Sequence, residues 1–226
     1  MPSILCVVAH PDDEAFGSPG TIAWYVSRGV PVDLLTFTRG QDGTKSAAAD
    51  SPEALGRLRE DETRTSARVL GIRTLTILDD MDGELDKADV DELAAHITRS
   101  IGGGDIDTII AMGPMGITNH ADHITVHHAT MRAVERSGRE LQVFYQAVGS
   151  EFAKEMNVTG PEAEPTHHID ISAFFETKLA ALACHSSQED ARQFFAMIAQ
   201  GRPKVEWFHR ALPPYNGDGL ATDLFA

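Results

Sequence analysis

The chain opens with the stretch Ser3-Ile-Leu-Cys-Val-Val-Ala9 and continues at once with His10-Pro11-Asp12-Asp13-Glu14. The apolar run is short and almost uninterrupted, which predicts a strand that is buried on both faces. Residues 13–28 follow with apolar side chains at helical spacing, and Gly29 ends that segment. A strand, a polar loop and a helix in this order form the repeating unit of a parallel sheet.

The same unit recurs through the first two thirds of the chain. We expect further strands and helices in alternation: strands at 30–37, 74–78, 106–111 and 141–145, and helices at 52–70, 85–101 and 123–137. The alternation predicts an α/β fold, a three-layer, Rossmann-like, doubly wound and mostly parallel sheet with helices on both faces. Ligands of such sheets bind at the carboxyl ends of the strands.

The last third of the chain is less regular. Residues 150–165 are polar, contain two prolines and show no clear period, so we expect a long loop or flap there. A further strand is expected at 166–171, then helices at 173–184 and 189–200. Nothing in the sequence requires a second domain, and residues 1–226 are expected to form one domain.

Composition and charge exclude several classes of protein. With 34 Asp+Glu against 19 Lys+Arg the net charge is −15, which would repel a nucleic acid backbone, so no nucleic acid partner is expected. No apolar run approaches the ~18 residues of a membrane span. Two cysteines are too few for a disulfide framework, and no secretory signal is recognisable, so a cytoplasmic protein is expected. The sequence leaves a homo-oligomer open.

The first candidate site follows the first strand. His10, Asp12 and Asp13 place an imidazole and two adjacent carboxylates at a strand end, where they can coordinate a divalent cation and leave one carboxylate to act as a base. In the alternative interpretation, Asp12 or Asp13 caps the following helix. This pentapeptide alone does not separate the two.

A second polar cluster follows the strand expected at 106–111. His120 and His123 flank Asp122 in a loop that runs into a helix, as expected of a metal-binding imidazole, its carboxylate partner and a second functional imidazole. Both clusters follow parallel strands and can therefore converge, which favours a metal site. His127 and His128 lie further along the same helix and are left out, because a histidine on a helix face is more often unliganded.

With these motifs the chain resembles the LmbE/PIG-L family of zinc-dependent de-N-acetylases, which remove acetyl groups from N-acetylglucosamine in phosphatidylinositol glycans, thiol-cofactor precursors and chitin fragments. The resemblance is carried by Ala9-His-Pro-Asp-Asp-Glu14 with His120-Ala-Asp-His123, and weaker matches extend it over nearly the whole chain. Two positions depart from the family pattern, since Ala121 replaces a usual proline and Asn119 a common glycine. Neither change removes a reactive group.

The resemblance implies that His10, Asp13 and His123 bind Zn²⁺. Three protein ligands leave a position for water, and zinc lowers the pKa of that water towards ~7. The same nitrogen and oxygen ligands also accept Fe²⁺, Co²⁺ or Ni²⁺.

The resemblance also implies the catalytic roles. Asp12 would be the general base, and His120 would stabilise the oxyanion or protonate the leaving amine. Asp122 is expected to hold an imidazole in the needed orientation and to favour its protonated form.

Substrate contacts are expected from two further residues. The resemblance places an arginine of the helix at 52–70 near the sugar or its anionic substituent, which makes Arg59 the candidate, although most charges on this helix would form solvated pairs. Asp82 is a candidate for sugar hydroxyls. Structural roles are expected for the remaining polar and thiol groups singled out, namely Arg39 as a brace of its loop, and His185, Gln188, Cys6 and Cys184.

The resemblance implies a metal-dependent hydrolase of a linear amide, acting on a small amino-sugar conjugate of the N-acetylglucosamine type, and the residues of the site are consistent with that chemistry. One alternative is a metal-dependent hydratase or lyase, or an amidase on a non-sugar substrate, using the same site. Another is a binding protein that keeps the fold without catalysis. The last is disfavoured because Asp12 and His120, which turnover needs and metal affinity does not, are both present.

Overall fold

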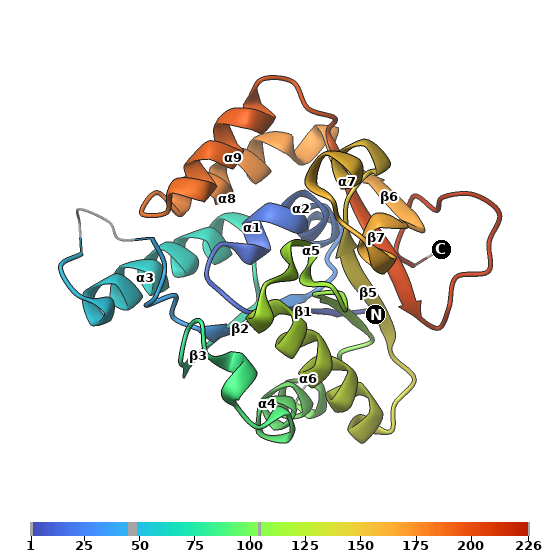
Figure 1. Cartoon of the computed structure of the whole chain (residues 1–226). Helices are drawn as coiled ribbons and strands as arrows, with labels where there is room; N and C mark the ends of the chain where they lie inside the picture. The colour runs from blue at the N-terminus through green and yellow to red at the C-terminus, as the bar shows by residue number, and fades with distance from the viewer. Residues whose placement is uncertain (1, 45–48, 104, 226) are drawn as a thin grey trace.

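The computed structural model describes residues 2–44, 49–103 and 105–225, and in this part of the chain seven strands form one sheet in the order β3-β2-β1-β4-β5-β7-β6 (Figure 1). The five parallel strands are β1 (Ile4–Val8), β2 (Val32–Thr38), β3 (Thr74–Asp80), β4 (Thr108–Ala111) and β5 (Gln142–Ala147). β7 (Val205–Leu212) pairs antiparallel with both β5 and β6 (His167–Asp170). The expected mostly parallel α/β sheet is confirmed.

Helices cover both faces of this sheet. On one face α4 (Val90–Gly102) packs against α6 (Ala121–Ser137), and on the other α2 (Pro19–Ser27) and α3 (Pro52–Leu70) pack against α8 (Phe175–Cys184) (Figure 1). The remaining helical segments of the described residues are α1 (Asp13–Gly17), α5 (Gly116–Asn119), α7 (Ser150–Met156), α9 (Glu189–Ala199), η1 (Leu85–Lys87), η2 (Gly160–Ala163) and η3 (Ser172–Phe174). Among the described residues, none of the helices combines the length and the apolar composition that crossing a membrane requires.

The core explains the apolar run near the start of the chain. Every residue of β1, from Ile4 to Val8, is at most 1% exposed, because helices lie over both faces of this central strand. Its neighbour β4 is buried along its whole length as well. The two strands pair in parallel with Ile4 opposite Thr108 and Val7 opposite Ala111, so their carboxyl ends lie side by side.

Three expectations about the elements were wrong in part. The segment 150–165 is not a simple loop, since it holds α7 and η2. The helix expected at 13–28 is divided at Ser18, where Pro19 begins a second helix. The helix expected at 85–101 begins only at Val90, after η1. In addition, β7 was not expected at all.

β7 was missed because it buries a charge. Glu206 is 2% exposed, and its carboxylate accepts hydrogen bonds from Lys178 Nζ at 2.9 Å and from the backbone N–H groups of Gly20 and Thr21. A carboxylate at an inward position hides the alternation by which a strand is recognised. Its partners come from α2 and α8, which the local sequence does not reveal.

Candidate metal centre and active site

The two polar motifs converge where β1 and β4 end. Nε2 of His123 lies 3.2 Å from Nδ1 of His10 and 3.3 Å from Oδ1 of Asp13, and Nδ1 of His10 lies 3.6 Å from Oδ2 of Asp13. These three side chains form a group whose ligand atoms are close enough to hold one metal ion. They come from positions up to 113 residues apart.

The atoms that point away from this centre are held by other groups. Nδ1 of His123 donates to the carbonyl of Gly116 at 3.1 Å, so in the neutral ring Nε2 carries no proton and can bind a metal. Oδ2 of Asp13 accepts from the backbone N–H groups of His10 at 2.8 Å and Ala9 at 3.2 Å. Two oriented imidazoles and one carboxylate fit a zinc-type ion with an open position.

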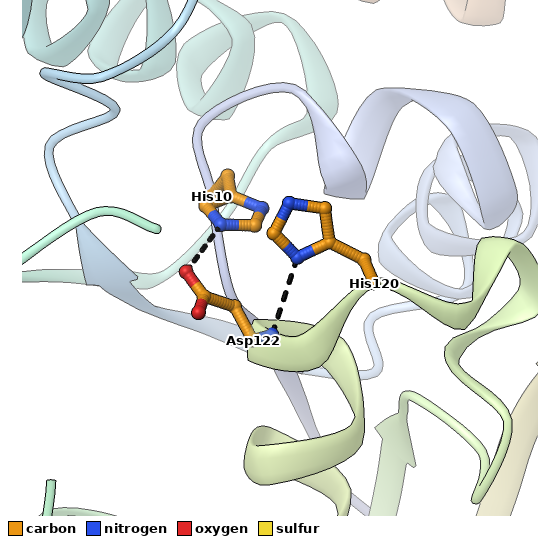
Figure 2. A group of neighbouring side chains, drawn as sticks. All are labelled: His10, His120 and Asp122. Atoms are coloured by element: carbon orange, nitrogen blue, oxygen red, sulfur yellow. Dashed lines mark hydrogen bonds and ion pairs between the residues drawn. The ribbon is translucent and has the colours of Figure 1, made fainter. Parts of the chain in front are cut away.

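A second group, His10, His120 and Asp122, also brings ligand atoms close together (Figure 2). Here, however, the atoms are engaged with one another. Nε2 of His10 lies 3.0 Å from Oδ2 of Asp122, and Nδ1 of His120 accepts from the backbone N–H of Asp122 at 3.2 Å (Figure 2). This group therefore supports the site around His10 rather than offering a second metal position.

The carboxylate of Asp122 contacts one imidazole of the site, that of His10. Its carboxylate is fully buried and accepts from the backbone N–H groups of Gly83 at 2.8 Å and Leu85 at 3.0 Å in addition to its contact with His10. The imidazole that Asp122 orients is therefore His10, and His120 contacts its backbone. Burial and the nearby rings of His10 and His123 hold the pKa of His120 below its ordinary value, although the charge of Asp122 opposes them.

Asp12 occupies the N-cap position of α1 but makes no side-chain capping bond, so the capping interpretation is wrong for it. Its φ is 90°, a left-handed conformation that costs about 1–3 kcal/mol in a residue other than glycine. The carboxylate is turned to Arg59, whose Nη2 lies 3.0 Å from Oδ2. The backbone N–H of Asp12 donates to Oε2 of Glu14 at 3.1 Å, so the strained turn is held from both sides.

Burial also sets the proton affinities of the site. It raises the pKa of Asp12 to about 7, an effect that Arg59 opposes and Asp13 reinforces. Asp13 is also buried, yet the charges and hydrogen bonds of His123 and His10 hold its pKa well below the usual range. Burial alone would lower the pKa of His10, but hydrogen bonds with Asp122, Asp13 and Asp82 outweigh it and raise that pKa well above 6.5. A carboxylate whose pKa lies near neutrality is suited to accept a proton at physiological pH.

The two expected substrate contacts already have protein partners. Arg59 is 4% exposed and donates to the carbonyls of Pro11 at 2.7 Å and Gly40 at 3.0 Å as well as to Asp12. Asp82 is 8% exposed, lies 3.1 Å from Nε2 of His10 and accepts from the backbone N–H of Asp42. Both residues therefore lie beside the centre, and each contacts one of its side chains.

Glu14 has a structural role that its sequence context does not reveal. Glu14 is fully buried, and its Oε1 accepts from Ser66 Oγ at 2.6 Å and lies 2.7 Å from Nε2 of His185. His185 thus supports the loop of Asp12 through Glu14, whose other oxygen accepts from the N–H of Asp12. Gln188 accepts from the backbone N–H of Thr44 at 3.0 Å. Other expected structural residues lie as follows: Arg39 in ion pairs with Glu53, Glu60 and Asp79, Cys6 in the core, and Cys184 half-buried.

The loop before α6 carries strained backbone. Gly116, Ile117 and Asn119 all have positive φ, of 58°, 59° and 59°. Asparagine tolerates this conformation better than most residues, which accounts for Asn119 at a position where the resemblance implies a common glycine. Ile117 is β-branched and is strained there. Such strain concentrates at functional sites, where the surroundings hold it.

Comparison with known proteins points to one family. Residues 5–134 match the PIG-L family model, described as GlcNAc-PI de-N-acetylase. A Bacillus cereus protein named as a probable N-acetyl-alpha-D-glucosaminyl L-malate deacetylase 2 is 35% identical over 192 residues, covering 83% of this chain and 84% of the relative. An Acidothermus cellulolyticus protein named 1D-myo-inositol 2-acetamido-2-deoxy-alpha-D-glucopyranoside deacetylase is 29% identical over 275 residues, covering 99% and 94%.

Solved structures share the fold. The N,N'-diacetylchitobiose deacetylase from Pyrococcus horikoshii superposes with a TM-score of 0.75 at 24% identity, covering 92% of this chain and 83% of that one. A 4-carboxy-2-hydroxymuconate hydratase from Pseudomonas putida superposes with a TM-score of 0.70 at 17% identity, covering 96% and 99%. At these identities the likeness concerns the fold alone, and proteins of this fold include both a deacetylase and a hydratase.

Proposed function

The chain belongs to the PIG-L family of GlcNAc-PI de-N-acetylases, and on that premise we propose that it is a metal-dependent hydrolase that removes the acetyl group from an N-acetylglucosamine conjugate. The observation that carries the proposal is the convergence of His10, Asp13 and His123, with the buried Asp12 next to Asp13 in the chain. The family description and the names of the relatives share an N-acetylated glucosamine and differ in what it is attached to. The substrate class is therefore an amino-sugar conjugate.

The proposed metal ligands are His10, Asp13 and His123. A divalent cation bound there, with zinc as the proposed metal, would polarise the acetyl carbonyl and acidify a water molecule. The donor set supports this because the second atom of each ligand is already held by a carboxylate, a carbonyl or a backbone N–H. Orientation of each ring and carboxylate thus does not depend on the ion.

Asp12 is proposed as the general base. It is 5% exposed, next to a proposed ligand, and its pKa near 7 allows it to take a proton from the attacking water at neutral pH. Arg59 holds the carboxylate in place through Nη2. The proton would then pass to the leaving amine as the carbon–nitrogen bond breaks.

His120 is proposed to stabilise the negative charge that develops on the acetyl oxygen. Because Nδ1 accepts the backbone N–H of Asp122, the proton of the neutral ring is on Nε2, which donates to no residue in the described part of the chain. The lowered pKa keeps the ring neutral near pH 7, which favours hydrogen bonding to the oxyanion over donation of a full proton. Unlike His10 and His123, His120 is exposed and can reach a bound substrate.

Arg59 and Asp82 are kept as proposed substrate contacts. Each is almost fully buried, so a sugar could touch only its exposed edge. Arg59 also holds Asp12, and Asp82 also contacts His10. Each residue would therefore both order the site and contact the sugar. We further propose a single domain that acts in the cytoplasm on a small molecule and does not bind nucleic acid, on the grounds of the charge of −15 and the two cysteines.

The function is tested by acetate release. Zinc-loaded protein is incubated with N-acetylglucosaminyl inositol, N-acetylglucosaminyl malate and diacetylchitobiose, and free acetate and amine are measured against the Asp12→Asn variant. Release from at least one conjugate by the wild type alone is the expected result. Hydration of an unsaturated acid without acetate release from any conjugate would instead favour a hydratase.

A further inference from the structure

η2 carries a carboxylate that has no part in the proposed mechanism. Glu162 is fully buried, and its backbone carbonyl accepts from Val148 N–H at 2.9 Å, just after β5. Oε1 accepts from the backbone N–H of Met115 at 2.7 Å. Oε2 is buried as well, and among the described residues it has no hydrogen-bond partner. Burying a carboxylate with one oxygen unpaired is costly. The hydrogen bond that its other oxygen accepts from Met115 therefore needs an explanation.

That contact leads to a proposed metal ligand. Two peptide bonds beyond the N–H of Met115, the carbonyl of Gly116 accepts from Nδ1 of His123 at 3.1 Å. Nε2 of the same ring faces His10 and Asp13. A short path therefore runs from the Glu162 carboxylate through the Met115–Gly116 backbone to the imidazole.

The backbone on this path needs to be held. Gly116 and Ile117 both have positive φ, and such conformations persist only where the surroundings over-determine them. Within the loop, the N–H of Gly116 bonds to the carbonyl of Gly113 at 3.0 Å, which closes a turn. The side chain of Glu162 connects this turn to η2 through Met115. The backbone of Glu162 is in turn bonded to Val148, just after β5, which fixes the position of η2.

Gly113 makes room for the carboxylate. A Cβ atom at this position would overlap the carboxyl group of Glu162. Gly113 does not have a positive φ, so glycine is needed here for space and not for its backbone conformation. Gly113 and Glu162 therefore fit one another as a pair.

We propose that Glu162 is a positioning residue of the metal centre: by holding Met115 it places the Gly116 carbonyl that orients His123. The proposal rests on the ligand set proposed above. Within the described residues, Glu162 makes no hydrogen bond or ion pair with the proposed ligand side chains, and in this proposal it acts through the loop.

The first test measures metal binding without turnover. Zinc affinity is measured by competition with a chromophoric chelator, and the visible spectrum of the Co²⁺-loaded protein reports the ligand geometry. Glu162→Ala should weaken zinc binding about tenfold and alter the cobalt spectrum, as loss of an outer partner of a ligand typically does. Glu162→Gln keeps an acceptor for Met115 and should restore most of both. Glu164→Ala, which removes an exposed carboxylate beside η2, should match the wild type.

The second test uses the fit between Gly113 and Glu162. Gly113→Ala should push the carboxylate off Met115 and weaken zinc binding to a similar degree, whereas in the Glu162→Ala background the same change should cost little more. Such non-additivity is expected of residues that act through one contact. Should Glu162→Ala not fold, the cobalt spectrum of Gly113→Ala alone decides the question.

Two results would overturn the inference: an unchanged affinity and spectrum in Glu162→Ala, or strictly additive losses in the double variant. His123→Ala, measured in parallel, separates this failure from that of the proposed site. If His123→Ala loses zinc while Glu162→Ala does not, only the role of Glu162 is wrong. If His123→Ala binds zinc as the wild type does, the ligand set is wrong.

Discussion

The carboxylate of Asp122 lies 3.0 Å from Nε2 of His10, although 112 positions separate the two residues. Nδ1 of the same ring faces His123, so one imidazole joins both motifs through its two nitrogens. Asp122 is itself fixed by the N–H groups of Gly83 and Leu85. The ring of His10 is thus oriented before any metal binds.

Asp122→Asn should therefore weaken metal binding. The amide keeps the size of the side chain but loses the charge that holds Nε2–H of His10, and a loss of about 10- to 100-fold in zinc affinity is expected. Competition with a chelator measures it. Asp61→Asn, which removes an exposed carboxylate of α3, serves as the control. Equal affinities in the two variants would mean that Asp122 does not support the metal through His10.

Substitutions of Asp12 and of His123 should have different effects on turnover and on metal binding. Asp12→Asn should retain zinc, because the three proposed ligands are untouched, yet lose about 10²- to 10⁴-fold in kcat, because an amide cannot accept a proton from water. His123→Ala should lose zinc and activity together. Metal content and acetate release are measured on the same samples. An Asp12→Asn protein as free of zinc as His123→Ala would make Asp12 a ligand instead of a base.

The role of Arg59 can be determined by comparing the effects of its substitution on kcat and on KM. If its main task is to hold Asp12, to which Nη2 donates at 3.0 Å, then Arg59→Gln should lower kcat by about tenfold or more with little change in KM. A rise in KM at constant kcat would show instead that the guanidinium binds the sugar in the ground state. Arg57→Gln, an exposed arginine paired with Glu53 on the same helix, should leave both constants unchanged.

His120 should act by hydrogen bonding. Loss of one oxyanion donor typically costs about 10²- to 10³-fold in kcat, and His120→Ala should fall in this range. Gln can still donate a hydrogen bond, so His120→Gln should keep clearly more activity than His120→Ala. KM should change less than kcat in both, because the contact is made mainly to the transition state. Equal losses in the two variants would indicate transfer of a full proton.

The sequence was enough to predict that the two motifs meet, because parallel neighbouring strands bring their carboxyl ends together, and β1 and β4 do so. It could not show that Asp122 would contact His10, since that depends on how the chain turns at His120, the N-cap residue of α6. The support from Glu162 was equally hidden. One acidic residue in a polar segment without periodicity gives no sign that it is buried, or that its partner is a backbone N–H 47 positions away.

A buried histidine far from the metal centre bears on stability. His167 of β6 is fully buried. The centroid of its ring lies 5.0 Å from that of Phe144 and 4.9 Å from that of Tyr215. Its Nδ1 lies 2.8 Å from Thr166 Oγ1, and its Nε2 has no hydrogen-bond partner within the described ranges of the chain. Burial lowers the pKa of His167 to about 4, helped by Arg210 and His209 and opposed by Asp223.

The protein should therefore become less stable as the pH falls, because His167 titrates differently in the folded and unfolded states. Because its pKa is about 4 in the folded state and about 6.5 when unfolded, the unfolded chain takes up a proton that the folded chain refuses as pH falls below 6.5. At pH 5 this uptake should cost about 1–2 kcal/mol of unfolding free energy relative to pH 7.5. His167→Gln does not titrate, so its deficit relative to the wild type should shrink by that amount at pH 5. Urea unfolding of both metal-free proteins at the two pH values measures the difference, and a deficit independent of pH would show that His167 is not held neutral by the fold.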